Sequence, residues 1–135
     1  MPNRIIIAAA LIGDGDGQLL LVRKRGTAAL MQAGGKLDPG ETPFQALARE
    51  LEEELGYRPA QAEVSFLGTF AAEAANEPDH FLEAHLFHLR AAGGQFRIAA
   101  ELEEAVWVSI EEAAALHLAP FTREHVLPIA RLLSA

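Results

Sequence analysis

The sequence has no cysteine, which excludes disulfide bonds and thiolate metal sites. It has no apolar run close to the roughly 20 residues that a membrane-spanning helix needs, so no membrane partner is expected. The first residues lack the charged segment, apolar core and cleavage site of a secretory signal. Together these absences favour a cytoplasmic protein.

Basic residues are few, with 11 lysines and arginines against 19 aspartates and glutamates, and the formal net charge is −8. Binding to a nucleic-acid polymer needs basic patches that neutralise phosphates, so this charge balance disfavours such a partner. A small phosphorylated ligand stays open if a divalent cation mediates its binding. Hydrophobic residues make up 50% of the 135 residues, which predicts one domain over residues 1–135 with a single core.

Hydrophobic patterning predicts strands and helices that are intermixed along the chain. The expected strands are 4–12 and 18–24, which would form a hairpin, then 63–72, 80–90 and 105–110. Gly93-Gly94 is predicted as a turn, and the expected helices are 42–55, 110–116 and 122–133, the last with Pro128 as a weak point. This mixture predicts an α/β (α+β) fold in which a mixed sheet packs between helices.

Helix 42–55 has the clearest ends of these elements. Thr42 is a suitable N-cap, Pro43 fits the first helical position, and Gln45 completes a Thr-x-x-Gln capping box. Gly56 suits the left-handed residue that commonly ends a helix. These signals predict a helix whose start and end are defined to within a residue.

The same helix carries a dense group of carboxylates. A helical wheel places Glu50, Glu53 and Glu54 at spacings i, i+3 and i+4 on the face opposite the apolar stripe, with Glu52 away from them as a solvated bystander. One interpretation is a solvated acidic surface in which Arg49 pairs with Glu53. Because neighbouring like charges destabilise a helix, the alternative is that the three carboxylates hold a cation.

A hard divalent cation fits this carboxylate group. Mg²⁺ takes oxygen ligands in octahedral geometry, usually from carboxylates, water and substrate phosphates. Gly34 and Gly35, in the loop expected ahead of the helix, would let the backbone approach metal or phosphate closely because no Cβ intervenes. Residues 38–41 in that loop have the Pro-Gly centre of a type II turn. A merely solvated helix would not need such a specified loop.

The spacing of these residues resembles the Nudix box, Gly-x5-Glu-x7-Arg-Glu-U-x-Glu-Glu-x-Gly-U, where U is a bulky aliphatic residue. Residues 35–57 match every fixed position of the box, with Gly35, Glu41, Arg49, Glu50, Glu53, Glu54 and Gly56. Tyr57 departs from the pattern at the last U, and Ala33 stands where relatives often have proline. The chain therefore resembles a small, single-domain, MutT-like Nudix hydrolase with an α/β/α sandwich fold.

The resemblance implies a chemistry and a cofactor. Nudix hydrolases cleave a nucleoside diphosphate linked to another group X, using water and Mg²⁺ or Mn²⁺. By this resemblance, the metal ligands would be the carboxylates of Glu50, Glu53 and Glu54 and the carbonyl of Gly35. One of these glutamates, or a carboxylate elsewhere, would also take a proton from the attacking water.

The resemblance also implies roles for three further residues. Arg49 would orient a box glutamate through a salt bridge. Glu41 would tie the loop to the helix or reach the metals through water. Glu101 lies where family members often carry a glutamate that reaches the metals or acts as general base. The alternative for Glu101 is an ordinary loop carboxylate beside its acidic neighbours.

Three basic residues are candidates for binding substrate phosphates, namely Arg23, Arg25 and Lys36. Arg23 and Arg25 alternate on the second strand and are expected to face one way, and their alternative is solvation at the strand end. Glu83 lies in an otherwise apolar strand and needs a partner. It either forms a structural ion pair, which we favour, or faces the substrate cleft. The five histidines show no ligand spacing and are interpreted as non-catalytic.

No pattern after the box identifies a substrate subgroup. The ADP-ribose group tends to have a proline one strand after the box and the dinucleoside polyphosphate group a tyrosine, and residues 71–75 contain neither. The remaining interpretation is a MutT-like enzyme that splits a nucleoside triphosphate into a monophosphate and pyrophosphate. The alternatives are an ADP-ribose, nucleotide-sugar or dinucleotide pyrophosphatase, or a non-catalytic nucleotide-sensing module. Whether the protein forms a homodimer stays open.

Overall fold

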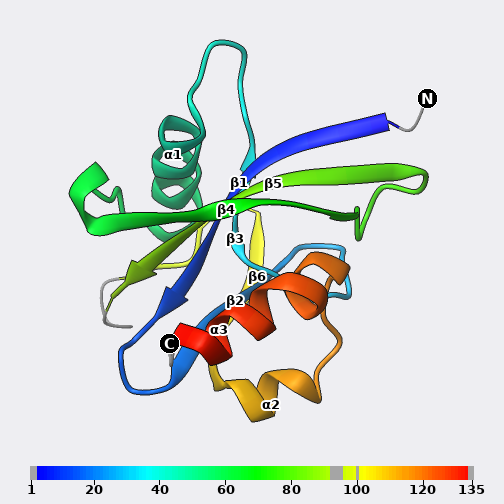
Figure 1. Cartoon of the computed structure of the whole chain (residues 1–135). Helices are drawn as coiled ribbons and strands as arrows, with labels where there is room; N and C mark the ends of the chain where they lie inside the picture. The colour runs from blue at the N-terminus through cyan, green and yellow to red at the C-terminus, as the bar shows by residue number, and fades with distance from the viewer. Residues whose placement is uncertain (1–2, 92–95, 100, 134–135) are drawn as a thin grey trace.

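The computed structural model describes residues 3–91, 96–99 and 101–133, and within these residues the chain forms a six-stranded mixed sheet (Figure 1). The strand order is β4-β5-β1-β2-β6, and β3 pairs with β1 beside this path. The strands are β1 (Asn3–Gly13), β2 (Gln18–Lys24), β3 (Ala33–Lys36), β4 (Val64–Glu73), β5 (His80–Arg90) and β6 (Leu102–Ser109). The turn predicted at Gly93-Gly94 lies outside the described residues.

Helices cover both faces of this sheet (Figure 1). Helix α1 (Pro43–Leu55) covers one face, while α2 (Ile110–Ala114), the π-helical turn η3 (Thr122–Val126) and α3 (Leu127–Leu133) cover the other. A 3₁₀ turn, η1 (Gln61–Glu63), precedes β4. The predicted mixed sheet between helices is therefore confirmed. No helix among the described residues is long and apolar enough to span a membrane.

Strand β1 is the centre of the core. It is paired in parallel with β5 along its whole length, from Asn3 opposite His80 to Gly13 opposite Arg90. Its other edge is shared, because β3 pairs with residues 7–10 and β2 pairs at Gly13. Alternate residues of a strand point to opposite faces, so Ala8, Ala10 and Ile12 pack under α1 and Ala9 and Leu11 pack under the C-terminal helices. A central strand buried on both faces reads as a continuous apolar run.

The predicted ends of helix α1 are confirmed. Thr42 Oγ1 accepts a hydrogen bond from the Gln45 backbone N–H at 3.2 Å, and Gln45 Oε1 accepts one from the Thr42 N–H at 2.9 Å. Gly56 ends the helix with a φ of 68°. The predicted turn ahead of the helix is also present, since the Glu41 N–H donates to the Asp38 carbonyl at 3.0 Å.

Pro128 does not end the C-terminal helix, although it changes its geometry. Residues 122–126 form a π-helical turn that ends two positions before it, and the Leu127 N–H bonds to the Thr122 carbonyl five residues back. A proline inside a helix lacks an N–H and its ring clashes with the carbonyl of the preceding turn. A widened turn accommodates both defects, so the helix continues to Leu133.

Some predicted boundaries differ from the structure. Strand β4 begins at Val64 because Glu63 belongs to the 3₁₀ turn, and β6 begins at Leu102, earlier than predicted. Helix α2 ends at Ala114 rather than at residue 116, although its predicted capping box on Ser109 is present.

The expectation that Gly34 and Gly35 lie in a loop is wrong, because they are the two central residues of strand β3. This strand is antiparallel to β1, with Gly34 opposite Ala9 and Gly35 opposite Ala8. Gly34 has a φ of +144°, and a Cβ added there would lie 2.1 Å from the Ala8 carbonyl oxygen. The strand can pair with β1 in this register because its second residue has no side chain.

Gly34→Ala is expected to destabilise the fold more than alanine at another glycine that has a positive φ but lies in open space. The added methyl group overlaps the β1 backbone, whereas Gly17, with a φ of +91°, has no atom within 4 Å of the same position. Strain at a positive φ costs about 1–3 kcal/mol, and overlap adds to it at Gly34 only. Urea unfolding of Gly34→Ala and Gly17→Ala measures the difference. Equal losses would show that backbone overlap is unimportant.

Candidate active site

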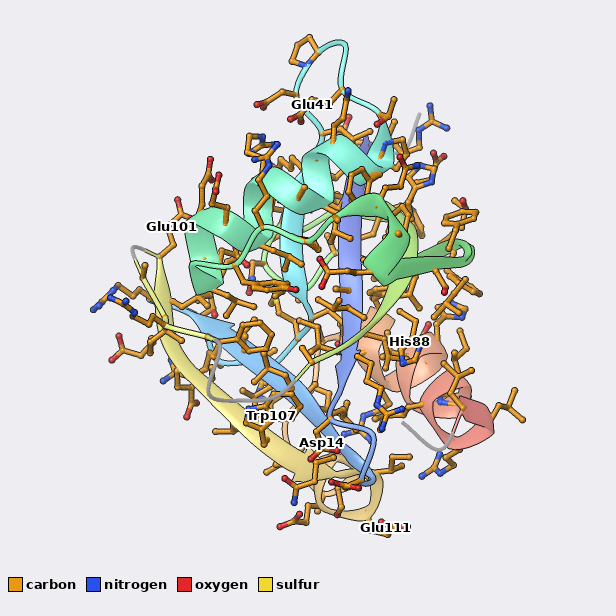
Figure 2. All side chains as sticks on the ribbon, turned by 90° about the vertical axis from the view of Figure 1, so that its left-hand side faces the viewer. Asp14, Glu41, His88, Glu101, Trp107 and Glu111 are labelled. Carbon is orange, nitrogen blue, oxygen red and sulfur yellow. The ribbon has the colours of Figure 1, made fainter. Side chains whose placement is uncertain are left out.

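Four carboxylates line one hollow beside α1, which we call the carboxylate pocket: Glu50, Glu53, Glu54 and Glu101. Three of them come from the last two turns of α1, and Glu101 comes from the residue before β6. The chain reaches this place because the Arg97 and Ala99 N–H groups bond to the carbonyls of Leu55 and Glu54 at 2.9 and 3.0 Å. Figure 2 shows Glu101 near the end of α1 that is remote from Glu41.

Glu54 is buried, with only 3% of its surface exposed, so its expected position opposite the apolar stripe is wrong. Strand β3 packs on the flank of α1 and covers it. Glu54 Oε1 accepts a hydrogen bond from the Gly34 N–H at 3.1 Å, whereas Oε2 has no partner among the described residues. Burial raises the pKa of Glu54 to about 7, and the nearby charges of Glu50 and Glu101 act in the same direction.

Glu50 and Glu53 differ in their surroundings. The Glu50 side chain is mostly covered, and a Cβ on Gly35 would lie 2.4 Å from its Cδ. Glycine at position 35 therefore makes room for this carboxylate. The Glu53 side chain is 58% exposed and its nearest cation is Arg49, at 3.6 Å. The pocket thus combines one buried, one covered and one exposed carboxylate on a single helix.

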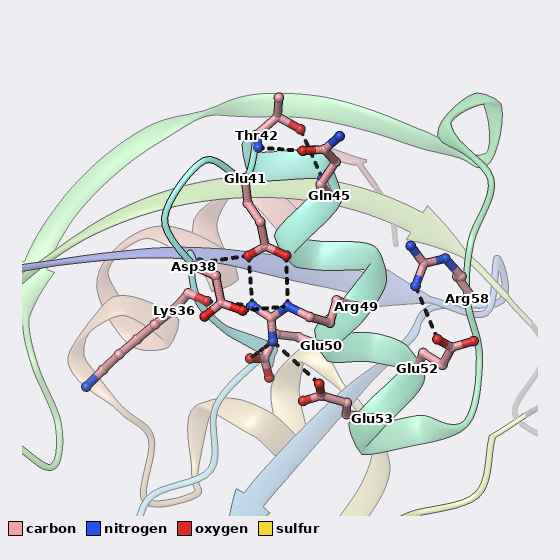
Figure 3. A network of polar contacts seen from close by, with 10 residues as sticks. All are labelled: Lys36, Asp38, Glu41, Thr42, Gln45, Arg49, Glu50, Glu52, Glu53 and Arg58. Carbon is pink, nitrogen blue, oxygen red and sulfur yellow. Dashed lines mark hydrogen bonds and ion pairs between the residues drawn. The ribbon is translucent and has the colours of Figure 1, made fainter.

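Arg49 joins the loop ahead of α1 to the helix (Figure 3). Its Nε and Nη2 donate to the two carboxylate oxygens of Glu41 at 2.8 and 2.9 Å, and Nη2 also donates to the Lys36 carbonyl at 3.0 Å. The bidentate hydrogen bond to Arg49 is the main reason that the pKa of Glu41 falls to about 2. Glu41 in turn accepts from the Asp38 N–H at 2.7 Å, so the loop is held at both ends.

The same guanidinium reaches the carboxylate pocket. Arg49 Nη1 lies 2.8 Å from Glu50 Oε1 and 3.6 Å from Glu53 Oε1. These distances fit the expected role of orienting box glutamates, although Glu41 is the partner that Arg49 binds with two hydrogen bonds. Glu52, in contrast, faces away and pairs with Arg58 at 3.1 Å, which agrees with its interpretation as a bystander.

The donor set of the carboxylate pocket fits a hard divalent cation. Carboxylate oxygens are the ligands that Mg²⁺ and Mn²⁺ prefer, and Glu54 Oε2 is a buried oxygen without a partner. Among the described residues, no three acidic or histidine side chains already stand in the arrangement of a metal site. Glu50 is paired with Arg49 instead, so binding of a cation would require these side chains to converge.

Two further hollows adjoin the pocket. The connecting hollow is lined by Lys24, Arg25, Thr27, Asn76, Glu77 and Glu101, and it shares Glu101 with the carboxylate pocket. The apolar cavity shares Lys24, Asn76 and Glu77 with the connecting hollow. Its other lining residues are Ile5, Ile7, Ala9, Met31, Gln32, Gly34, Gly35, Lys36, Ala74, Ala75 and Leu82. The three hollows are therefore linked in sequence by shared lining residues, with the connecting hollow in the middle.

Two of the three predicted phosphate-binding residues line these hollows. Lys36 lines the apolar cavity and pairs with Glu77 at 3.2 Å. Arg25 follows the end of β2, lines the connecting hollow and contacts Glu103 at 3.1 Å. Arg23 lines none of the three hollows, because it is bound to Glu104 and to the Thr27 carbonyl.

Lys24 also belongs to this region, although it is not among the phosphate-binding residues predicted from the sequence. It lines both the apolar cavity and the connecting hollow, and its charge favours the ionised form of Glu54. The register between β2 and β6 shifts between Arg23 and Lys24, at the point where β2 ends. The available signal was strand alternation, which places Lys24 on the opposite face from its two arginine neighbours.

Glu83 and the histidines lie away from the site. Glu83 pairs with Arg4 at 3.0 Å and lies 3.6 Å from His85, so the favoured structural pairing is present. None of the five histidines lines the three hollows.

The comparisons with known proteins agree with this geometry. The family model of the NUDIX domain matches residues 3–129. The chain therefore belongs to the Nudix family and is a Nudix hydrolase. Members of this family generally use divalent metals.

Three relatives illustrate the similarity. The CTP pyrophosphohydrolase of Escherichia coli K12 is 35% identical over 122 residues, which cover 87% of this chain and 85% of that protein. The 8-oxo-dGTP diphosphatase of Haemophilus influenzae is 44% identical over 69 residues, covering 47% of this chain and 51% of that protein. The solution structure of the E. coli ORF135 protein superposes with a TM-score of 0.76 at 31% identity, covering 98% of this chain and 92% of the other.

In the metal-free protein, Glu54 is expected to make the free energy of unfolding fall as the pH rises. Its carboxyl titrates near 4.5 in the unfolded chain and near 7 in the fold. Between these pH values Glu54 stays protonated in the folded protein but is ionised in the unfolded chain. Its contribution to the free energy of unfolding is therefore full below pH 4.5 and is lost by about pH 7. The loss is about 3 kcal/mol.

Urea unfolding in the presence of a chelator, at pH 5 and pH 8, measures this change. Glu54→Gln should remove it, whereas Glu52→Gln, on the same helix but solvated, should keep it. An unaltered pH dependence in Glu54→Gln would show that another group is responsible.

Proposed function

We propose that the protein hydrolyses a nucleoside triphosphate to a nucleoside monophosphate and pyrophosphate, with Mg²⁺ or Mn²⁺ as cofactor. The observation that carries this proposal is the continuity of the three hollows, which runs from a cluster of carboxylates past a lysine to an apolar cavity. This order matches the order of metal, phosphates and base along a metal-bound nucleotide. The similarity to a CTP pyrophosphohydrolase and to an 8-oxo-dGTP diphosphatase supports it.

The triphosphate would lie between the carboxylate pocket and the connecting hollow. Glu50, Glu53 and Glu54, with the Gly35 carbonyl, would hold the metal. When bound, the cation would neutralise phosphate charge, lower the pKa of water and align attack on phosphorus. Glu101 lines both hollows and would stand beside the reacting phosphate.

The residues of the chain have distinct tasks in this scheme. Lys24, which lines both the connecting hollow and the apolar cavity, would bind the phosphates, with Lys36 and Arg25 beside it. Arg49 would hold Glu50 and Glu53 in position while its bond to Glu41 fixes the loop. The proton of the attacking water would pass to one of the pocket carboxylates, which are the bases lining that hollow.

The apolar cavity would receive the nucleobase. Its lining includes Ile5, Ile7, Ala9 and Leu82, which offer the apolar contact that a flat aromatic ring requires. Strand β3 separates this cavity from α1, and its glycines keep the wall thin. A nucleotide could therefore reach from the base cavity to the carboxylates around a single strand.

The alternative substrates are ADP-ribose, another nucleotide sugar or a dinucleotide. A panel of ribo- and deoxyribonucleoside triphosphates, ADP-ribose and dinucleoside polyphosphates, assayed with Mg²⁺ and with Mn²⁺, distinguishes them. We expect the highest kcat/KM with a nucleoside triphosphate and release of pyrophosphate rather than of single phosphates. Best turnover of a nucleotide sugar would replace our proposal with that alternative.

Glu53→Gln and Glu54→Gln are each expected to lower kcat roughly 100-fold or more, because each substitution removes a charge that acts on the metal and transition state. The matched control is Glu52→Gln, which directly precedes them in sequence but pairs with Arg58 outside the pocket. Thermal unfolding of each variant verifies that the fold is retained. Binding of panel members by the wild-type protein without hydrolysis of any would favour a nucleotide-sensing module instead.

A further inference from the structure

Gln32 is buried, and its side-chain amide has a hydrogen-bond donor without a partner among the described residues. Only 5% of its surface is exposed, and its Oε1 accepts a hydrogen bond from Thr122 Oγ1 at 2.6 Å. Its Nε2 is buried and has no partner among the described residues. A buried donor without an acceptor costs about 1–3 kcal/mol, and such groups in native proteins usually have a functional or solvent partner.

The position of this amide points to a ligand. Gln32 lies directly before β3 and lines the apolar cavity, together with side chains such as Ile7, Ala9 and Leu82 that have no polar group. Thr122 is completely buried in the C-terminal helical layer, on the same side of the sheet as the cavity. The pair therefore places a polar group in the wall of a hollow that is lined largely by apolar residues.

Thr122 is bonded to one end of the amide. Its hydroxyl donates to the carbonyl oxygen of Gln32, so the NH₂ group is the end left for a ligand. An amide NH₂ group has two hydrogens to donate and cannot accept. Nε2 is buried beside a cavity that Gln32 lines, so a ligand that reaches this group from the cavity must supply an acceptor.

We propose that Gln32 is a specificity-determining residue whose Nε2 donates a hydrogen bond to a carbonyl oxygen of the substrate base, with Thr122 as the residue that positions the amide. The inference rests on the proposed function and narrows the range of nucleobases that the substrate can carry. Guanine, cytosine, uracil, thymine and hypoxanthine carry ring carbonyls, and adenine carries none. The substrate class is therefore a nucleoside triphosphate with a carbonyl-bearing base.

The first test compares substrates on the wild-type protein. We expect kcat/KM for the best of GTP, CTP, UTP and ITP to exceed that for ATP by about 10–100-fold, because a site built around a buried donor rejects a ligand that leaves it unpaired. ITP and ATP form the closest pair, since their bases differ at the carbonyl or amino group of C6 and in the N1 proton. Equal kcat/KM for ATP and all four carbonyl-bearing substrates would overturn the proposal.

The second test alters the amide. Gln32→Met keeps the side-chain length and removes the donor. It should lower kcat/KM for the preferred substrate by about the wild-type preference factor and leave ATP within about 2-fold. Thr122→Val should also reduce the preference because the amide is no longer oriented, whereas Thr122→Ser keeps the hydroxyl and should retain it. A preference unchanged in both Gln32→Met and Thr122→Val contradicts the proposed roles.

A third measurement does not depend on hydrolysis. The side-chain NH₂ signals of Gln32 in a ¹⁵N-resolved NMR spectrum are assigned by their loss in Gln32→Met or, should that variant not fold, by selective labelling. Inosine monophosphate should shift these signals and adenosine monophosphate should not. If no triphosphate is hydrolysed but this selective shift occurs, the proposed function fails and the role of Gln32 stands. Equal shifts, or none with either nucleotide, mean that Nε2 binds only water and overturn the inference.

Discussion

The packing of strand β3 against the flank of helix α1 is the contact on which the site depends. Two consecutive glycines let this strand lie between the β1 backbone and the carboxylates of α1. Gly34 approaches the Ala8 carbonyl and donates its N–H to Glu54, and Gly35 leaves room for Glu50. A side chain at either position would separate the strand from one of its two neighbours. The glycine pair thus places backbone within reach of the carboxylate pocket and forms the wall of the apolar cavity.

This packing brings like charges together, and the chain compensates for them in two different ways. Toward the N-terminal end of α1, Arg49 neutralises Glu41 and reaches Glu50 and Glu53. Deeper in the structure, burial raises the pKa of Glu54 to about 7, so that this carboxyl can hold a proton near neutral pH. A divalent cation would replace both forms of compensation, because it supplies the positive charge that the arginine and the proton provide in its absence. The repulsion between the carboxylates of α1 is therefore compensated even when no metal is bound.

Much of the local structure was predictable from particular residues. Thr42, Gln45 and Gly56 identify the ends of α1 because capping depends on neighbours in sequence. The spacing of Glu50, Glu53 and Glu54 also depends on one segment, and it matches the Nudix box. Pro128 illustrates the limit of such reasoning. Its local effect predicts a weak point, whereas the structure accommodates it after a π-helical turn and the helix continues.

The sequence by itself determined the family, the mixed fold and the residues of the box, since each depends on side-chain type and spacing along one segment. Only the tertiary structure decided that Glu54 is buried, that Lys24 rather than Arg23 lines the hollows, and that Gln32 is hydrogen-bonded to Thr122, ninety positions away. The physical reason is that burial and pairing depend on which segments meet in space. The register of β3 on β1 and the packing of the C-terminal helices bring those segments into contact. A local sequence pattern does not predict such contacts.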